Sequence, residues 1–202
     1  MKWRDKLIKR IFDIVSSFFG LILISPIILF ISIWIKVDSK GPIFFRQKRV
    51  GQHGVLFDIL KFRTMVVDAE KKGKQITVGR DPRITNCGYF LRKYKLDELP
   101  QLFNVLRGEM SLVGPRPEVP YYVKKYSEKQ KKVLKVKPGI TDLASIKYSD
   151  ESIILAQAAN AEQFYIDRVM PDKLDLNLQY AENATITKDI HIILMTIAKI
   201  LK

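Results

Sequence analysis

The longest apolar segment of the chain runs from Ile11 to Ile35, and Asp13 is the one charged residue within it. A helix of about 25 residues is long enough to cross roughly 30 Å of hydrocarbon, so the segment predicts a membrane element. Ser25 and Pro26 lie near its middle. A proline there removes a backbone hydrogen bond and bends the helix, while a serine hydroxyl can satisfy the freed carbonyl. We therefore expect a helix that is bent near its centre.

Basic residues flank this segment on both sides. They are Lys2, Arg4, Lys6, Lys9 and Arg10 before it, and Lys36, Lys40, Arg46, Lys48 and Arg49 after it. Because such flanks favour the cytoplasm, both ends are expected on that face, in a re-entrant geometry with Asp13 at the headgroup level. The residues alone leave a straight transmembrane span open. A signal peptide is not expected, because the apolar part is too long and no small-residue cleavage pattern follows it.

Length and charge limit the remaining possibilities. The 202 residues suit one globular domain plus a membrane element. Lysine and arginine number 35 against 21 acidic residues, and the net charge of +14 indicates a polyanionic partner, which is nucleic acid, anionic lipid or a phosphorylated substrate. The single cysteine, Cys87, excludes an internal disulfide, and the isolated His53 and His191 cannot assemble a zinc site. The glycine patterns of ATP and dinucleotide sites are absent from the sequence.

Two adjacent carboxylates, Asp97 and Glu98, begin a distinctive stretch that ends at Gly108. Apolar residues recur there at helical spacing, at Leu99, Leu102, Phe103 and Leu106. The pattern predicts a helix with Asp97 as its N-cap and Gly108 as its end. The amides and dipole of a helix start favour an anion, and a carboxylate pair there is able to hold a divalent metal carrying a phosphate. Simple capping is the alternative, since acidic residues are common at helix starts that perform no chemistry.

A rigid element follows this helix. Pro115 and Pro117 fix their own φ angles and push Gly114 and Arg116 toward extended conformations, so Arg116 lies on a stiff segment. A guanidinium held in this way suits a phosphate, whose oxygens it can bind in pairs. Together with the carboxylate pair, it favours a site for a phosphorylated ligand.

A small antiparallel element and several cations precede these motifs. Residues 43–45 and 55–60 predict two strands of a hairpin joined through residues 51–54. Strand alternation would place Lys61 and Arg63 on one side, either to meet a diphosphate or as solvated cations of an edge strand. A turn and helix then carry three arginines toward Asp97, and we expect about two of the three to touch phosphate while the rest pair with acids. These are Arg80, Arg83 and Arg92.

The rest of the chain is predicted to be helical. We expect a very basic helix over residues 121–137, whose charge either forms a solvated face or lies against anionic headgroups. Breaks are expected near Pro171 and Asn183, and the apolar face of the last helix favours core packing or a position at the membrane surface. The predicted fold is α+β and mainly helical, with a small antiparallel strand element and amphipathic surface helices. Residues 1–40 would form the membrane element and residues 41–202 the globular domain.

Several motifs, taken together and in order, resemble the bacterial sugar transferases called monotopic phosphoglycosyl transferases. They are Lys61-Phe62-Arg63-Thr64-Met65, Asp81-Pro82-Arg83-Ile84-Thr85, Leu91-Arg92, Leu96-Asp97-Glu98-Leu99-Pro100-Gln101-Leu102, Met110-Ser111-Leu112-Val113-Gly114-Pro115-Arg116-Pro117-Glu118 and Pro138-Gly139-Ile140-Thr141. The resemblance implies transfer of a sugar 1-phosphate from a UDP-sugar to a polyprenyl phosphate, with Mg²⁺, at the cytoplasmic face of the bacterial inner membrane. It also favours the re-entrant form over a straight span, with residues 1–40 as the membrane-inserted bent helix and residues 41–202 as the cytoplasmic catalytic domain with interfacial helices. Asp97 would be the nucleophile, and Glu98 would position metal or assist proton movement. Both are expected to hold Mg²⁺, and the expected phosphate-binding residues are Lys61, Arg63, Arg80, Arg83, Arg92 and Arg116.

The resemblance weakens after Thr141. Many members continue Gly-Trp-Ala-Gln and then Gly-Arg-Asn, whereas residues 142–151 here read DLASIKYSDE, so no sugar-recognition residue is assigned and the UDP-sugar stays open. A rival interpretation is a membrane-tethered basic protein that binds anionic lipid or nucleic acid. Net charge would suffice for it, but it does not explain the placement of Asp97, Glu98 and Arg116. We therefore expect an enzyme with phospholipid membrane as a partner and no nucleic acid.

Overall fold

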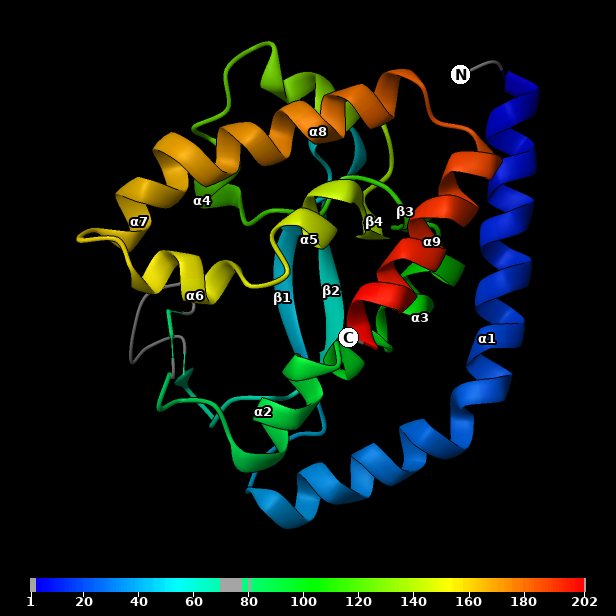
Figure 1. Cartoon of the computed structure of the whole chain (residues 1–202). Coiled ribbons are helices and arrows are strands. Elements are labelled where there is room, and N and C mark those ends of the chain that lie inside the picture. Colours follow the sequence, from blue (N-terminus) through cyan, green and yellow to red (C-terminus); the bar gives the residue numbers. More distant parts are fainter. Residues whose placement is uncertain (1–2, 70–77, 80, 202) are drawn as a thin grey trace.

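The computed structural model describes residues 3–69, 78–79 and 81–201. One long helix, α1 (Trp3–Asp38), runs down one edge of the molecule, changes direction and continues below the rest (Figure 1). The other helices surround two small sheets in the middle of the molecule (Figure 1). The mainly helical α+β fold predicted from the sequence is therefore confirmed.

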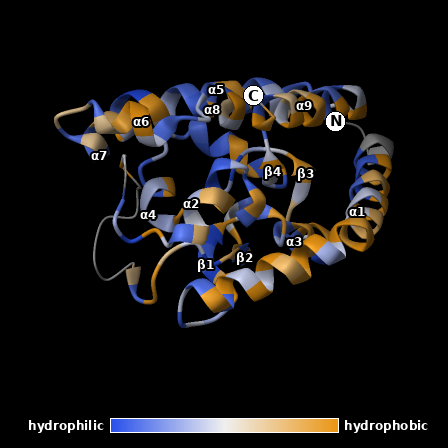
Figure 2. Ribbon diagram, turned by 60° about the horizontal axis from the view of Figure 1, so that its bottom comes forward, coloured by the Kyte–Doolittle hydropathy of each residue, from blue (hydrophilic) through white to orange (hydrophobic). Residues whose placement is uncertain are grey.

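The bend in α1 has the cause that the sequence predicts. Pro26 lies inside the helix and has no amide to offer the carbonyl of Ile22, four residues earlier. The hydroxyl of Ser25 donates to that carbonyl at 2.8 Å. The span Lys6–Asp38 is long and apolar enough to cross a membrane, and most of its length is exposed. Figure 2 shows α1 as predominantly hydrophobic.

The remaining helices are short, apart from two near the C-terminus. They are α2 (Asn86–Lys93), α3 (Gln101–Arg107), α4 (Pro120–Val123), α5 (Leu143–Lys147), α6 (Glu151–Ala156), α7 (Ala161–Phe164), α8 (Met170–Glu182) and α9 (Ile186–Ile200). A π-helical segment, Tyr165–Val169, joins α7 to α8. The predicted break near Asn183 is confirmed, because α8 ends there. The predicted break near Pro171 is wrong, because the chain stays helical from α7 through the π-helical segment into α8, and Pro171 lies in the first turn of α8, where its missing amide costs little.

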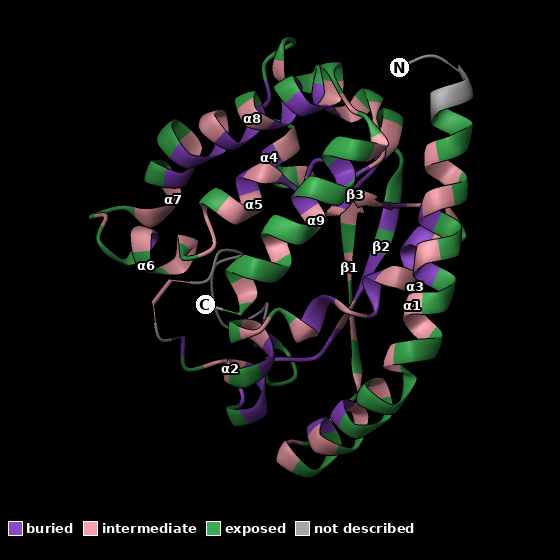
Figure 3. Cartoon of the chain, turned by 45° about the vertical axis from the view of Figure 1, so that its right-hand side comes forward, coloured by how far each residue is buried: buried purple, intermediate pink, exposed green. Residues whose placement is uncertain are grey.

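The predicted hairpin is confirmed, with a longer first strand. Strands β1 (Phe44–Val50) and β2 (Leu56–Phe62) pair antiparallel, from Val50 opposite Leu56 to Phe44 opposite Phe62. Buried residues concentrate on β2 and on the inner side of α8 (Figure 3). Phe57 and Ile59 of β2 pack against Val105 of α3, so the hairpin is fixed to the helix that follows the carboxylate pair.

A second, parallel pair of strands was not predicted. Strands β3 (Ser111–Val113) and β4 (Gly139–Thr141) are too short to show a period-2 pattern. Their approach depends on two glycines, because a Cβ on Gly139 would lie 2.0 Å from the amide nitrogen of Gly114. This pairing brings the Pro115–Pro117 segment next to residue 142.

The helix predicted around the carboxylates is organised differently. Residues Leu96–Glu98 form a 3-10 turn that begins with Lys95 in the left-handed region (φ 55°), and α3 starts only at Gln101. Asp97 as N-cap is therefore wrong, whereas Gly108 does end α3 in the left-handed conformation (φ 84°). The buried face of α3 consists of Gln101, Asn104 and Val105. The apolar repeat at Leu99, Leu102, Phe103 and Leu106 instead faces α1 and the solvent. It does so because α1 offers apolar side chains on that side.

The long basic helix predicted over residues 121–137 is also wrong. The chain forms the single turn α4 and then a separate 3-10 segment, Gln130–Lys135, while Pro138 leads into β4 rather than ending a helix. Tyr122, Tyr126 and Val133 are buried in one cluster, so core packing interrupts the helix that composition favours.

Candidate active site

The two carboxylates lie in the 3-10 turn that precedes α3 and are termed here the carboxylate dyad (Asp97 and Glu98). Their residues are 7% and 8% exposed, respectively. They line a cleft of about 1800 Å³, termed the dyad cleft, together with Lys61, Arg92 and Arg116. The structure therefore brings together four chain segments that carry the sequence-predicted chemistry.

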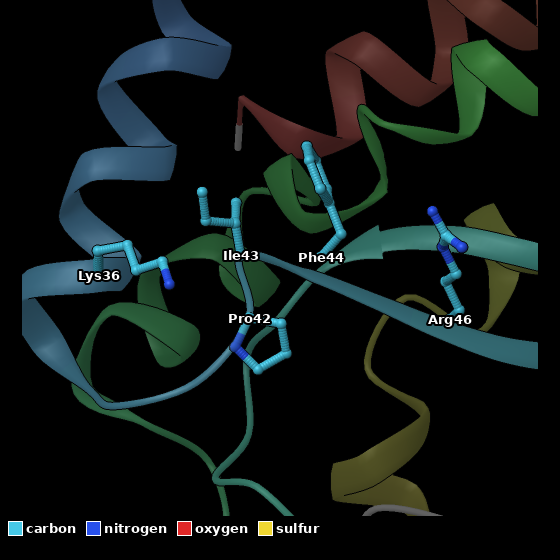
Figure 4. Close-up of a pocket in the computed structure, with 5 residues that line it drawn as sticks. All are labelled: Lys36, Pro42, Ile43, Phe44 and Arg46. Carbon is cyan, nitrogen blue, oxygen red and sulfur yellow. The ribbon is translucent and has the colours of Figure 1, made fainter.

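A smaller hollow of about 470 Å³ lies where α1 leads into β1, as Figure 4 shows. Its lining residues are Lys36, Pro42, Ile43, Phe44 and Arg46. This lining contains no carboxylate that could bind a metal, and its Lys36 Nζ already donates to the Gly41 carbonyl at 3.0 Å. The dyad cleft is thus the candidate active site.

Glu98 is held by two cations. Lys61 Nζ donates to Oε1 at 2.9 Å, Arg116 Nη1 donates to Oε2 at 3.1 Å, and Arg116 Nη2 also donates to Oε1. Burial by itself would raise the pKa of Glu98, but the charges and hydrogen bonds of Arg116 and Lys61 outweigh it and hold that pKa well below its usual range. Glu98 is therefore an ionised residue that fixes both cations.

Asp97 lies in a different environment. Within the described part of the chain, no hydrogen bond reaches its carboxylate, although the charges of Lys61, Arg92 and Lys95 act on it. Burial, reinforced by the neighbouring Glu98, raises the pKa of Asp97 despite those cations. The dyad thus contains one carboxylate engaged by protein cations and one that is free to meet a ligand in the cleft.

Arg116 is oriented from both its side chain and its backbone. Its amide donates to Oδ2 of Asp142 at 2.8 Å, and Oδ1 of Asp142 accepts from the Ser145 amide at 2.5 Å, at the start of α5. Asp142 is fully buried. Sequence reasoning missed this residue, because it follows directly after Thr141, where the family pattern fades.

Lys61 is positioned by a buried amide that the sequence analysis also missed. Asn104 accepts from the Leu60 amide at 3.0 Å and donates to the Asp58 carbonyl at 2.8 Å, which ties β2 to α3. Lys61 therefore extends from the end of β2 toward Glu98. Burial lowers the pKa of Lys61, and Glu98 partly offsets this effect. The signal available in the sequence was Asn104 itself, a polar residue on the face of α3 that is buried.

The other predicted phosphate-binding residues separate into different roles. Arg92 lines the dyad cleft and donates from Nε to the Thr64 hydroxyl at 2.9 Å. Arg83 also lines the cleft, but its Nη2 pairs with Asp81 at 2.6 Å. This is the pairing with an acidic residue that the sequence analysis expected for some of the three arginines. Arg80 lies outside the described residues.

Arg63 lines the dyad cleft, but its guanidinium is engaged at the end of α1. Because β2 ends at Phe62, the alternation expected for Lys61 and Arg63 does not continue. The buried Arg63 guanidinium donates to the Pro42 carbonyl at 2.6 Å and the Ser39 carbonyl at 2.9 Å, so it fastens the C-terminal end of α1.

A further polar group lines the same cleft. Arg49 Nη1 lies 3.7 Å from Glu118 Oε2, and the Tyr165 hydroxyl donates to Glu118 Oε1. Glu118 follows Arg116 by two residues, so both ends of the Arg116–Glu118 segment are held by ion pairs or hydrogen bonds. Sequence reasoning quoted Glu118 as part of a motif but gave it no role, since its partners are distant in the chain.

The described residues offer Mg²⁺ only a small group of side-chain ligands. Among the described residues there is no group of three or more side chains of the metal-binding types. Mg²⁺, however, is commonly held by one or two carboxylates together with substrate phosphates and waters. The unengaged carboxylate of Asp97 fits such a role. Glu98 fits it less well, because both of its oxygens already accept from cations.

A buried carboxylate pair among cations, in a domain fastened to an exposed apolar helix, defines a class of site suited to phosphorylated substrates at a membrane. The chain belongs to the bacterial sugar transferase family, which it matches over residues 4–202.

Named relatives are consistent with this assignment. A Bacillus subtilis protein called an uncharacterized sugar transferase, EpsL, is 37% identical over 195 residues, which cover 96% of this chain and 88% of the relative. The undecaprenyl-phosphate galactose phosphotransferase of Salmonella typhimurium is 42% identical over 158 residues, 70% of this chain and 33% of the relative. The UDP-glucose:undecaprenyl-phosphate glucose-1-phosphate transferase of Escherichia coli is 37% identical over 199 residues, 96% of this chain and 40% of the relative. The chain spans less than half of these last two relatives.

Proposed function

We propose that this chain transfers a sugar 1-phosphate from a UDP-sugar to a polyprenyl phosphate and so starts glycan assembly on a lipid carrier. The names of the relatives from Salmonella typhimurium and Escherichia coli support the reaction class. The observation that carries the proposal is the asymmetry of the dyad, in which Glu98 is bound by Lys61 and Arg116 while Asp97 remains unengaged.

In the first step, a carboxylate oxygen of Asp97 attacks the β-phosphorus of the UDP-sugar. The new bond joins Asp97 to that phosphorus, and the bond to the oxygen that bridges the α- and β-phosphates breaks. UMP leaves with the electron pair. The raised pKa of Asp97 supports this role, because a more basic carboxylate is a better nucleophile once it is ionised.

In the second step, an oxygen of the polyprenyl phosphate attacks the same phosphorus. The bond between phosphorus and Asp97 breaks, and the carboxylate is restored. The product is a polyprenyl diphosphate sugar, so charge and atoms balance without another reactant. Two successive displacements need the same phosphorus to be held near Asp97 throughout.

The surrounding cations carry the phosphate charge in this scheme. Lys61 and Arg116 are held by Glu98 at the edge of the cleft, and Arg92 approaches Asp97 from α2. Mg²⁺, held by Asp97 and secondarily by Glu98, would screen the diphosphate so that an anionic carboxylate can approach it. Arg63 is left out of this set, because its guanidinium is engaged at the end of α1.

We further propose that α1 enters and leaves the membrane by the cytoplasmic face. Both of its ends bond to the same globular domain. Near its beginning, Arg10 donates to the Val105 carbonyl at 2.6 Å, and at its end Ser39 accepts from Arg63 at 2.9 Å. A domain on one side of the bilayer can hold both ends only if the helix re-enters, and the bend at Pro26 supports that geometry.

A substrate panel tests the function. The purified chain in detergent, with Mg²⁺ and undecaprenyl phosphate, would be offered UDP-glucose, UDP-galactose and UDP-N-acetylgalactosamine. At least one should yield a lipid-linked diphosphate sugar and an equal amount of UMP. Formation of UDP in place of UMP would show transfer of the sugar without its phosphate and would reject the proposed reaction.

A further inference from the structure

We propose that the isoprenoid chain of the acceptor lies in an apolar groove between α1, α3 and α9. This inference rests on the proposed function and adds a binding site to it. The groove is the apolar half of the dyad cleft.

One stripe of residues from each neighbouring element lines the groove. From α1 it receives Phe12, Ser16 and Gly20, spaced four residues apart and therefore on one helix face. From the segment after the dyad it receives Leu99 and Leu102. From α9 and the residue after it, the groove receives the apolar Ile190, Ile193, Leu194, Ile197, Ile200 and Leu201, and the polar Thr196 and Lys199 line the same cleft. Apolar side chains thus predominate on the walls of this space, with a few polar ones among them.

The α9 face is not covered by the rest of the chain. Ile190, Leu194 and Ile197 are 45%, 60% and 50% exposed, and the buried residues of α9 are Asp189 and Ile192. Contiguous exposed apolar residues of this kind mark an interaction site. Figure 2 shows that α9 is mixed, with hydrophobic and hydrophilic residues along its length.

Continuity with the dyad identifies the occupant. The groove and the dyad belong to the same cleft, and Leu99 follows Glu98 by one position. A ligand that fills both halves must have an anionic head near Asp97 and an apolar tail along α9. The UDP-sugar has no such tail, whereas a polyprenyl phosphate has both parts.

The wall formed by α1 indicates where this ligand comes from. The same helix supplies the apolar span Lys6–Asp38, so the groove begins at the dyad and borders the membrane element. An isoprenoid tail would exchange one apolar environment for another, at little cost in hydration. The reactive phosphate would then reach the dyad without the tail crossing water.

A buried polar cluster fixes the spacing between two of the groove's walls. Lys9 of α1 pairs with Asp189 of α9 at 2.5 Å, and the Tyr180 hydroxyl donates to the same carboxylate at 2.5 Å. Asp189 is fully buried. Figure 1 shows α9 beside the upper part of α1. The ion pair between Lys9 and Asp189 fixes the distance between α1 and α9 at this end of the groove. The groove therefore has a defined width for an isoprenoid chain.

Gly20 offers a way to narrow the groove. A Cβ at this position would have Leu102 Cδ1 as its neighbour at an ordinary 3.8 Å, so a larger side chain would extend into the groove without a backbone clash. Leu23 is 80% exposed and does not line the cleft, so Leu23→Phe is a matched control on the same helix. On the opposite wall, Leu194 lines the cleft and its neighbour Met195 does not. Leu194→Trp therefore narrows the groove, and Met195→Trp is its matched control.

The test compares undecaprenyl phosphate, with eleven isoprene units, and citronellyl phosphate, with two. The measured quantity is the ratio of kcat/KM for the long acceptor to kcat/KM for the short one. Gly20→Phe and Leu194→Trp should each lower this ratio by about tenfold or more, because several buried methylene groups lose their contacts. Leu23→Phe and Met195→Trp should keep the wild-type ratio.

An unchanged ratio in Gly20→Phe and Leu194→Trp would overturn the inference, whether both acceptors lose activity together or neither does. The groove would then serve a phospholipid acyl chain, a second copy of the chain or packing alone. Failure of the wild type to transfer to any polyprenyl phosphate would reject the proposed function instead, so the two failures are distinguishable.

Discussion

The guanidinium of Arg116 contacts both carboxylate oxygens of Glu98, with Nη1 donating to Oε2 at 3.1 Å. This paired contact joins the Pro115–Pro117 segment to the turn that carries the dyad. Lys61, at the end of β2, binds the same carboxylate at 2.9 Å. Glu98 therefore organises the cations of the site, whereas no hydrogen bond reaches the carboxylate of its neighbour Asp97 within the described part of the chain.

Replacement of Arg116 tests the importance of paired geometry. Arg116→Lys keeps the charge but loses the planar fork, so we expect kcat/KM for the UDP-sugar to fall by about 10- to 100-fold. Arg107→Lys is a matched control, because Arg107 is exposed on α3. Membrane association should be the same in both variants. Wild-type turnover in Arg116→Lys would remove Arg116 from the site.

The pH dependence of the first half-reaction reports on Asp97. Burial and the neighbouring Glu98 raise the pKa of Asp97 above its ordinary value of 3.8. Since only the ionised carboxylate attacks, the rate of UMP release should fall as pH decreases through that raised pKa. Glu98→Gln removes a negative charge and releases Lys61 and Arg116 from their partner, and both changes favour ionised Asp97. The acid limb should move to lower pH, measured in single-turnover assays at saturating Mg²⁺. A limb that stays in place or moves upward would contradict the assigned coupling.

Local chemistry made much of the fold predictable. The bend at Pro26, the hairpin and the end of α3 at Gly108 each depend on residues adjacent in the chain. The start of α3 was not predictable in the same way. An acidic pair before an apolar repeat is typical of an N-cap, but here Lys95 enters the left-handed region and the dyad occupies a 3-10 turn. Tertiary contacts to Lys61 and Arg116 favour that turn, and they are not visible in local sequence.

The site was predictable where it depended on motifs. Asp97, Glu98, Lys61, Arg92 and Arg116 do meet in one cleft. The residues that position them were missed, because their partners are far apart in the chain. They are Asp142, which holds the Arg116 backbone, and Asn104, which ties β2 to α3. Arg63 lines the same cleft, but its guanidinium donates to the end of α1, and its role toward phosphate stays a prediction.

The topology of α1 can be measured with single cysteines. In a Cys87→Ser background, Lys6→Cys and Lys40→Cys place thiols at exposed positions near the two ends of the helix. Both should resist a membrane-impermeant thiol reagent in spheroplasts and react after lysis, because a re-entrant helix keeps both ends inside. Labelling of one cysteine alone in spheroplasts would show a spanning helix.

The packing of α2 against the segment that follows β2 predicts a stability effect. A Cβ on Gly88 would lie 2.1 Å from the Thr64 carbonyl oxygen, a backbone atom that cannot easily move. Gly88→Ala should therefore lower the free energy of unfolding by about 1 to 3 kcal/mol, measured by thermal unfolding in detergent. Gly20→Ala is the control, because its Cβ has room and alanine favours a helix. Equal stability of Gly88→Ala and wild type would show that α2 can shift away.

The covalent intermediate proposed on Asp97 is tested most directly by offering purified protein a UDP-sugar and Mg²⁺ without any lipid acceptor. UMP should appear up to about one equivalent per active site, and the intact mass should rise by one phosphosugar. Asp97→Asn should abolish both signals, because an amide is a poor nucleophile, whereas Glu98→Gln tests the neighbouring carboxylate. If UMP appears only when polyprenyl phosphate is present and no adduct is detected, the transfer is direct and Asp97 is not the nucleophile.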